Sequence, residues 1–200
     1  MSKVVRKGLF ILLLVCLPTL AHAHLVNSGL GPFYDGALHL LMSPGDLLGL
    51  VAVTLLAGLR GPRAGRLSVI VLPVAWFVAG LIGLNLSATL ALPWLSVLSL
   101  VILGALVAAD PKLPPGAVAT LAGLYGALHG LLNGSALAAI GAGPLSLFGI
   151  VVTVMVLALL VSAAVVSLQL AWTRIAVRVA GSWVAAVGLL MLGWLLQGAA

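Results

Sequence analysis

Beyond residue 24, apolar residues form long runs that are separated by short segments rich in glycine, proline or charged residues. A helix needs about 20 such residues to cross a hydrocarbon layer of ~30 Å. The runs predict six helices, over Phe33–Leu59, Leu67–Leu84, Leu86–Ala109, Ala117–Ala139, Leu145–Leu170 and Ile175–Leu196. We therefore expect an all-α fold, a polytopic membrane helix bundle that forms one transmembrane domain over residues 24–200.

Two prolines bear on these boundaries. Pro44 lies inside the first predicted helix, and because proline has no N–H and clashes with the preceding turn, we expect a kink after Ser43. Pro93 and Trp94 offer a later start for the third helix. That start would leave residues 85–92 as a loop on the outer side.

The composition supports a membrane protein. The chain is 64% hydrophobic and only 6% charged, and its three acidic residues are all Asp. A soluble domain carries roughly 25% charged residues, so this chain has too few to cover a soluble surface. The net charge of +6 does not indicate a nucleic-acid partner, because the basic residues form no stripe and are not interleaved with aromatic residues. The expected surroundings are a lipid bilayer.

The first 23 residues have the three parts of a secretory signal peptide. A basic start precedes an apolar run from about Leu9 to Leu17, and Ala21-His22-Ala23 offers the small residues that signal peptidase accepts. Lipid modification at Cys16 is the weaker alternative, because no small residue precedes this cysteine. Since Cys16 is the only cysteine, the mature chain would form no disulfide and no cysteine metal site.

Cleavage after Ala23 would make His24 the first residue. Its α-amine and imidazole would together chelate Ni²⁺ or Cu²⁺, although an ordinary exposed terminal histidine is the simpler interpretation. The six basic residues that remain fall in loops on one side of the predicted bundle: Arg60, Arg63, Arg66, Lys112, Arg174 and Arg178. The positive-inside rule then predicts that the mature N-terminus lies on the outer side of the membrane. The expected localisation is a bacterial inner membrane, with this end in the periplasm.

Two predicted helices carry polar groups on one face. In the first, Asp35, His39, Met42 and Asp46 are four, three and four residues apart, which would place Asp46 ~16 Å beyond Asp35. A buried Asp costs ~2.5–3.5 kcal/mol in a bilayer, so it is a functional candidate. Met42 is more simply explained by packing than as a thioether ligand.

The fourth predicted helix repeats the pattern with Tyr125, His129 and Asn133, and a neighbouring face of three glycines (Gly126, Gly130 and Gly134) would let another helix approach closely. We therefore predict a metal path along His24, Asp35, His39, Asp46, His129 and Asn133. Two simpler interpretations remain: an Asp46–His129 pair that only locks two helices together, and an Asp35 that only caps a helix. The five tryptophans are expected to anchor helix ends at the membrane interface.

These residues resemble the HupE/UreJ family, whose first span carries His, five residues and Asp-His. Here His39, the residues LLMSP and Gly45-Asp46 follow that pattern, with Asp46 at the second His position. A later family segment, Phe-His-Gly followed by His-Gly and a Glu, is matched by Leu128-His129-Gly130 and Asn133-Gly134, with Ala136 where the Glu would fall. The resemblance implies a nickel or cobalt permease linked to hydrogenase or urease maturation.

The sequence leaves three candidate functions to compare. The first is transport of a divalent metal ion, nickel or cobalt or else copper, with no tightly bound cofactor. The second is a non-transporting accessory protein that delivers metal to metalloenzyme maturation proteins. The third, an intramembrane serine protease, is disfavoured because Ser135 lies six residues after His129 and so points to another face of the same helix. We expect no enzymatic activity.

Overall fold

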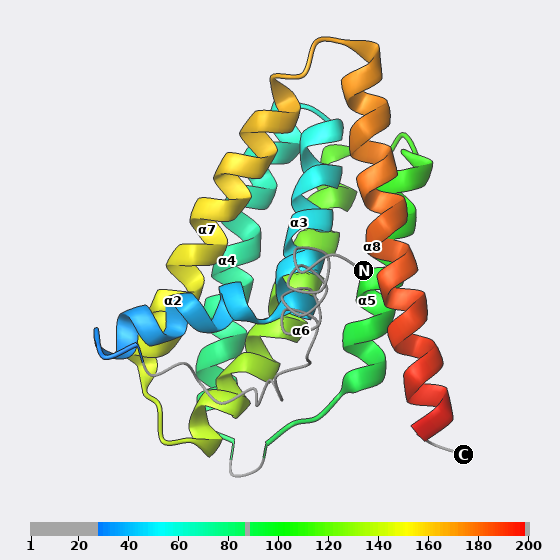
Figure 1. The fold of residues 1–200 in the computed structure, drawn as a ribbon. Coiled ribbons are helices and arrows are strands. Elements are labelled where there is room, and N and C mark those ends of the chain that lie inside the picture. Colours follow the sequence, from blue (N-terminus) through cyan, green and yellow to red (C-terminus); the bar gives the residue numbers. More distant parts are fainter. Residues whose placement is uncertain (1–27, 87–88, 199–200) are drawn as a thin grey trace, which may run out of the picture.

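The computed structural model describes residues 28–86 and 89–198, so the predicted signal peptide and His24 lie outside the described residues. Within the described residues the protein is all-helical (Figure 1). The helices are α2 (Pro32–Met42), α3 (Pro44–Leu59), α4 (Pro62–Leu84), α5 (Pro93–Ala109), α6 (Pro115–Ala139), α7 (Pro144–Val166) and α8 (Ala171–Gly198).

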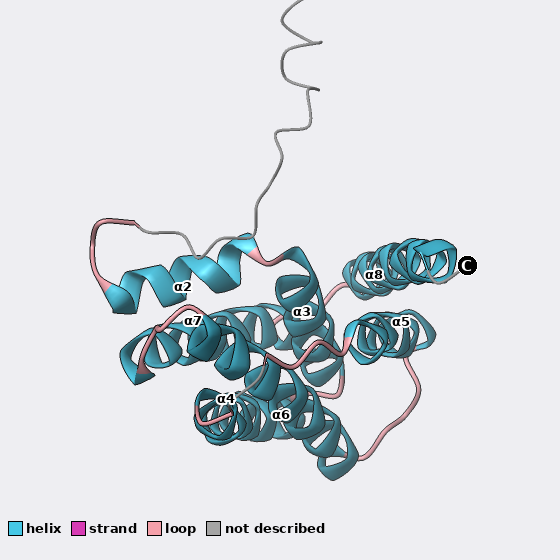
Figure 2. Ribbon diagram, turned by 90° about the horizontal axis from the view of Figure 1, so that it is seen from below, coloured by secondary structure: helices cyan, strands magenta, loops and turns pink. Residues whose placement is uncertain are grey.

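Helix α3 lies at the centre of the bundle, and the other helices surround it (Figure 2). Every residue from Ala52 to Leu59 is buried, which explains why this segment is apolar on all sides apart from Thr54, whose hydroxyl donates to the carbonyl of Leu50. Helix α4 packs along α6, α5 packs along α8, and α2 lies across α7. The core therefore forms around α3, whose N-terminal turn carries Asp46, the acid of the polar site described below.

The first predicted helix is broken rather than kinked. Helices α2 and α3 meet at Ser43 and their axes differ by 77°. Pro44 has no N–H to continue α2 and instead begins α3 as its first residue, where a missing N–H costs nothing. Ser43 completes the turn by donating its hydroxyl to the carbonyl of His39 at 2.8 Å. The prediction of one continuous polar face from Asp35 to Asp46 was therefore wrong.

The predicted number of spans also changes. Helices α4, α6, α7 and α8 are each long and apolar enough to cross a membrane, and the bent pair α2–α3 qualifies as a fifth span. Helix α5 begins at Pro93, the later of the two predicted starts, and its 17 residues rise only ~25 Å. The structure thus gives a helical membrane bundle with four or five candidate spans and one shorter apolar helix.

The glycine face of α6 brings α4 into backbone contact, as the sequence predicted. A Cβ on Gly130 would lie 2.2 Å from the carbonyl oxygen of Trp76, and one on Gly134 would lie 2.1 Å from that of Gly80. Glycine is required here because any side chain would push the two helices apart. This close pairing fixes the position of α6 and hence of its polar residues.

Within the described residues, every Lys and Arg lies in or beside a helix end at one end of the bundle, the upper end in Figure 1. Arg60, at the end of α3, forms an ion pair with Asp110 and donates to the carbonyl of Pro111 at 2.8 Å. Arg174 lies 3.7 Å from the second oxygen of Asp110 and also donates to the carbonyl of Leu59. Asp110 therefore joins α3, the α5–α6 connection and the start of α8.

Candidate functional site

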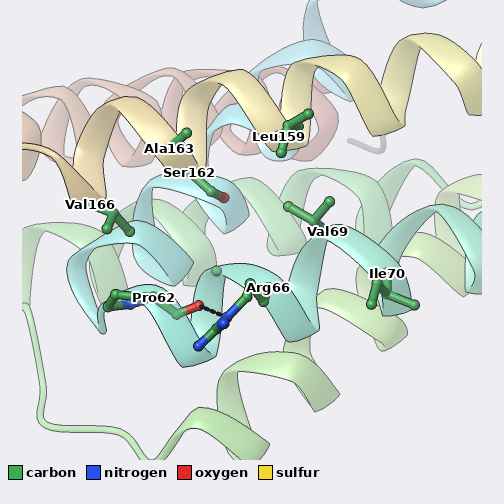
Figure 3. A pocket seen from close by; sticks show the side chains of 9 residues that line it. Pro62, Arg66, Val69, Ile70, Leu159, Ser162, Ala163 and Val166 are labelled. Atoms are coloured by element: carbon green, nitrogen blue, oxygen red, sulfur yellow. Dashed lines mark hydrogen bonds between the residues drawn. The ribbon is translucent and has the colours of Figure 1, made fainter.

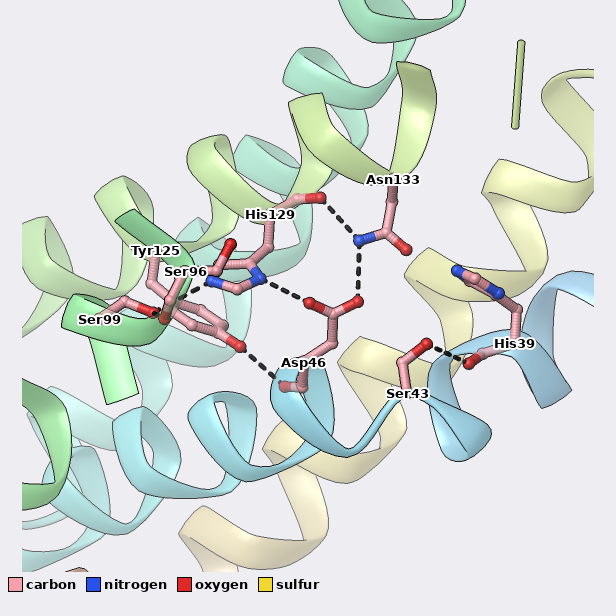
Figure 4. A network of polar contacts seen from close by, with 8 residues as sticks. All are labelled: His39, Ser43, Asp46, Ser96, Ser99, Tyr125, His129 and Asn133. Atoms are coloured by element: carbon pink, nitrogen blue, oxygen red, sulfur yellow. Dashed lines mark hydrogen bonds and ion pairs between the residues drawn. The ribbon is translucent and has the colours of Figure 1, made fainter. Parts of the chain in front are cut away.

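The polar centre of the bundle is formed by Asp46 on α3 and His129 on α6. Nδ1 of His129 lies 2.6 Å from Oδ1 of Asp46, and their side chains are 2% and 18% exposed, respectively (Figure 4). Because a carboxylate can only accept, the proton in this contact lies on the imidazole nitrogen. The structure thus brings together the two residues that the sequence placed opposite one another.

Asn133 completes the set from one turn further along α6. Its amide nitrogen donates to Oδ2 of Asp46 at 3.0 Å and to the carbonyl of His129 at 2.8 Å. Its side-chain oxygen, Oδ1, is buried and has no hydrogen-bond partner. An unpartnered buried oxygen beside a carboxylate is costly, and a bound cation or water would satisfy it.

Two further polar contacts hold the centre in place. The sequence placed Tyr125 on the same polar face but did not predict its contact, and it gave no indication of Ser99. The hydroxyl of Tyr125 donates to the backbone carbonyl of Asp46 at 2.7 Å. Oγ of Ser99, on α5, lies 3.2 Å from Nε2 of His129 and 2.7 Å from the carbonyl oxygen of Ser96, and its one hydroxyl proton can go to either. Both ring nitrogens of His129 are therefore occupied. Ser99 had no recognisable signal, because a single serine in an apolar helix is common.

Aromatic rings enclose His129. The Tyr125 ring stacks on its imidazole at a centroid distance of 4.2 Å, and Trp76 on α4 lies 5.9 Å from both rings. Trp76 is fully buried, so its predicted role as an interface anchor was wrong. The remaining tryptophans are exposed, in keeping with that role: Trp94, Trp172, Trp183 and Trp194.

A pocket of about 370 Å³ opens on one side of this centre. His39, Asp46 and Asn133 supply most of its polar lining. The segment before α5 and the first turn of α5 also line the pocket, through Leu90 to Pro93 and the polar Ser96. His39 projects from α2 near Asn133 (Figure 4). The break at Ser43 therefore leaves His39 and Asp46 on one pocket although they no longer share a helix face.

The other predicted ligands lie elsewhere. Oδ1 of Asp35 accepts from the backbone N–H and the hydroxyl of Ser28, at 2.7 and 2.6 Å, and Asp35 does not line the pocket. Asp35 lies in the first turn of α2, where it favours the helix through the macrodipole. Met42 is 65% exposed and does not line the pocket either.

The contacts of Ser99, His129 and Asp46 follow the same order as a hydrolase triad, with serine on one imidazole nitrogen and aspartate on the other. A hydrolase needs its nucleophile to reach the substrate. Neither Ser99 nor His129 lines the pocket, and only 1% of His129 is exposed. The arrangement holds Asp46 rather than presenting a nucleophile.

Among residues 28–86 and 89–198, no three His, Cys, Asp or Glu side chains converge as a metal cluster. The polar side chains that line the pocket are an imidazole, a carboxylate, an amide and a hydroxyl, from His39, Asp46, Asn133 and Ser96. The family described as HupE / UreJ protein matches the chain over residues 12–191, which is most of its length. Comparisons with curated proteins and with solved structures find no match.

Proposed function

The chain belongs to the HupE/UreJ family, and from this premise we propose that it is a permease for a divalent transition-metal ion, nickel or cobalt. The family is associated with nickel or cobalt uptake or metalloenzyme maturation and is transporter-like rather than enzymatic. We place the protein in a bacterial inner membrane with its mature N-terminus outside. The basic end of the bundle would then face the cytoplasm.

One observation carries the proposal: the buried oxygen of Asn133 has no partner and lies beside the Asp46 carboxylate, on the pocket that His39 also lines. Imidazole nitrogen with carboxylate and amide oxygen is a ligand set that Ni²⁺ and Co²⁺ accept. Three ligands leave coordination positions for water. Such a site would bind an ion weakly enough to release it, as transport requires.

His129 has a supporting part in this proposal. Both of its nitrogens are occupied and it is buried behind Asp46, so we assign it the role of orienting the carboxylate. Histidine–carboxylate pairs of this kind tune metal ligands in many proteins, and loss of such a partner typically lowers metal affinity about 10–100-fold. We assign Asp35 no part in metal binding, because its carboxylate accepts from Ser28 outside the pocket, and His24 would act first, on the outer side.

The alternative is an accessory protein that binds metal and passes it to maturation proteins without transport. Reconstitution of the purified full-length protein into liposomes separates the two. A permease should give saturable Ni²⁺ or Co²⁺ uptake above that of empty liposomes. Because the sequence contains no P-loop pattern, the assay should include an imposed proton gradient.

The same liposomes should contain a matched pair of variants. His39→Ala removes an imidazole from the pocket, whereas Asp35→Asn removes a charge from the same helix outside it. The proposal expects reduced uptake only for the first. Metal binding without any flux in the unaltered protein would favour the accessory function, and neither binding nor flux of nickel, cobalt or copper would reject both.

A further inference from the structure

A long apolar groove runs between α4 and α7 on the outside of the bundle. It consists of two hollows, of about 350 and 330 Å³, that share Val69 and Ile70 in their walls. The first hollow reaches Arg66 at the basic end of the bundle (Figure 3), and the second continues to Phe77 and Phe148. Apart from Arg66 and Ser162, the lining residues are apolar, alanine or glycine.

The dimensions of the groove match one leaflet of a bilayer. From Arg66 to Phe77 the helix advances eleven residues, or ~16 Å at 1.5 Å per residue. Half of a ~30 Å hydrocarbon layer is ~15 Å. If the phosphate of a lipid lies at the level of Arg66, its acyl chain would therefore reach along the groove to Phe77.

Arg66 is suited to bind that phosphate. It is exposed, and its Nε donates to the carbonyl of Pro62 at 3.3 Å. In the part of the chain that the structure describes, neither of its terminal nitrogens bonds to a protein group. A guanidinium binds phosphate in a two-pronged geometry, and basic residues at helix ends attract anionic lipids.

We propose that this groove binds one anionic phospholipid, with an acyl chain along Ile70 and the phosphate on Arg66. A second copy of the chain fits the surface less well. It would bring two basic ends together, and Asp110, the acidic residue that the structure places at this end, is already paired with Arg60 and Arg174. The proposal is independent of metal transport, because no residue of the groove lines the metal pocket.

The test is native mass spectrometry of the delipidated, detergent-purified protein mixed with phosphatidylglycerol or with phosphatidylcholine. We expect one phosphatidylglycerol per chain at concentrations at which phosphatidylcholine does not bind. Arg66→Gln should weaken this binding at least about tenfold. Arg63→Gln is the matched control. It removes the same charge from a residue that lies one turn before Arg66 and outside the groove. It should leave binding within about twofold.

A second variant tests the groove itself. Ile70 is 64% exposed, so Ile70→Trp should fill the shared part of the groove without disturbing the core. It should also abolish lipid binding, while the thermal unfolding temperature stays unchanged. Glycerol phosphate should not displace the lipid, because the acyl chain contributes to binding. Equal lipid binding by the unaltered protein, Arg66→Gln and Ile70→Trp would overturn the proposal. Full displacement of the lipid by glycerol phosphate would also overturn it, as would a dimer of the unaltered protein that Ile70→Trp dissociates.

Discussion

Replacing Asp46 with asparagine removes the charge from the metal pocket and preserves the shape of the side chain. The surrounding groups accommodate the new amide by one change, a shift of the His129 proton from Nδ1 to Nε2. Nδ1 then accepts from the new amide nitrogen, and Nε2–H donates to Oγ of Ser99, whose hydroxyl proton then goes to the carbonyl of Ser96. The new amide oxygen still accepts from Asn133.

The expected cost in stability is therefore small. Two hydrogen bonds to a charged acceptor become neutral ones, at a loss of about 1 kcal/mol each. The removal of a buried charge offsets this loss, because an effective desolvation penalty is several kcal/mol per buried ion. We expect the free energy of unfolding of Asp46→Asn to stay within about 2 kcal/mol of that of the unaltered protein. Metal uptake should fall about 100-fold or more, since loss of a mere supporting partner already costs about 10–100-fold.

The assay combines metal uptake into liposomes with thermal unfolding of the same preparation in detergent. Asp35→Asn is the control for loss of a carboxylate outside the pocket, and it should retain uptake. If the Asp46–His129 pair only locks two helices together, Asp46→Asn should keep both its stability and its uptake. Normal handling of Ni²⁺, Co²⁺ and Cu²⁺ in both Asp46→Asn and His129→Ala would refute the ligand hypothesis.

Three other predictions concern packing and topology. Gly130→Ala should destabilise the protein by about 1–3 kcal/mol in thermal unfolding, because the added Cβ meets the α4 backbone, whereas Gly116→Ala, with open space around it, should be neutral. Mass determination of the purified protein should give a mature chain that starts at His24; an intact signal peptide would remove the terminal-amine chelator. A cysteine at Arg63 should be shielded from an impermeant reagent applied outside, while one at Gly143 should react, and the reverse pattern would invert the proposed orientation.

The pairing of Asp46 with His129 was predictable from sequence because the energetics demand it. An Asp in an apolar helix needs a polar partner, and the fourth predicted helix carries its polar residues on a single face. The glycines at four-residue intervals on that helix also identified a face for close packing, and α4 occupies it. Regular spacing within one helix determines which residues share a face, and this does not depend on how the other helices pack.

Features that depend on several helices were not predictable. The sequence indicated that Pro44 would disturb the helix, but the 77° bend depends on how α2 packs across α7. Trp76 was misassigned because an indole ring suits both an interface and a core, and only the approach of α6 decides between them. Ser99 meets His129 through the position of α5, which no local pattern specifies.

The break at Ser43 has a physical consequence for Asp46. It makes Asp46 the third residue of a new helix, so the carboxylate lies at the positive end of the α3 dipole, an effect worth about 0.3–1 kcal/mol and up to ~2 kcal/mol when partly buried. In a continuous helix the same residue would gain nothing from the dipole and would bear the full ~2.5–3.5 kcal/mol cost of its depth. By turning α2 aside, the break also leaves the carboxylate on the pocket, which His39 lines as well. The proline that ends the predicted polar stripe thus both stabilises the acid and makes it accessible to a cation.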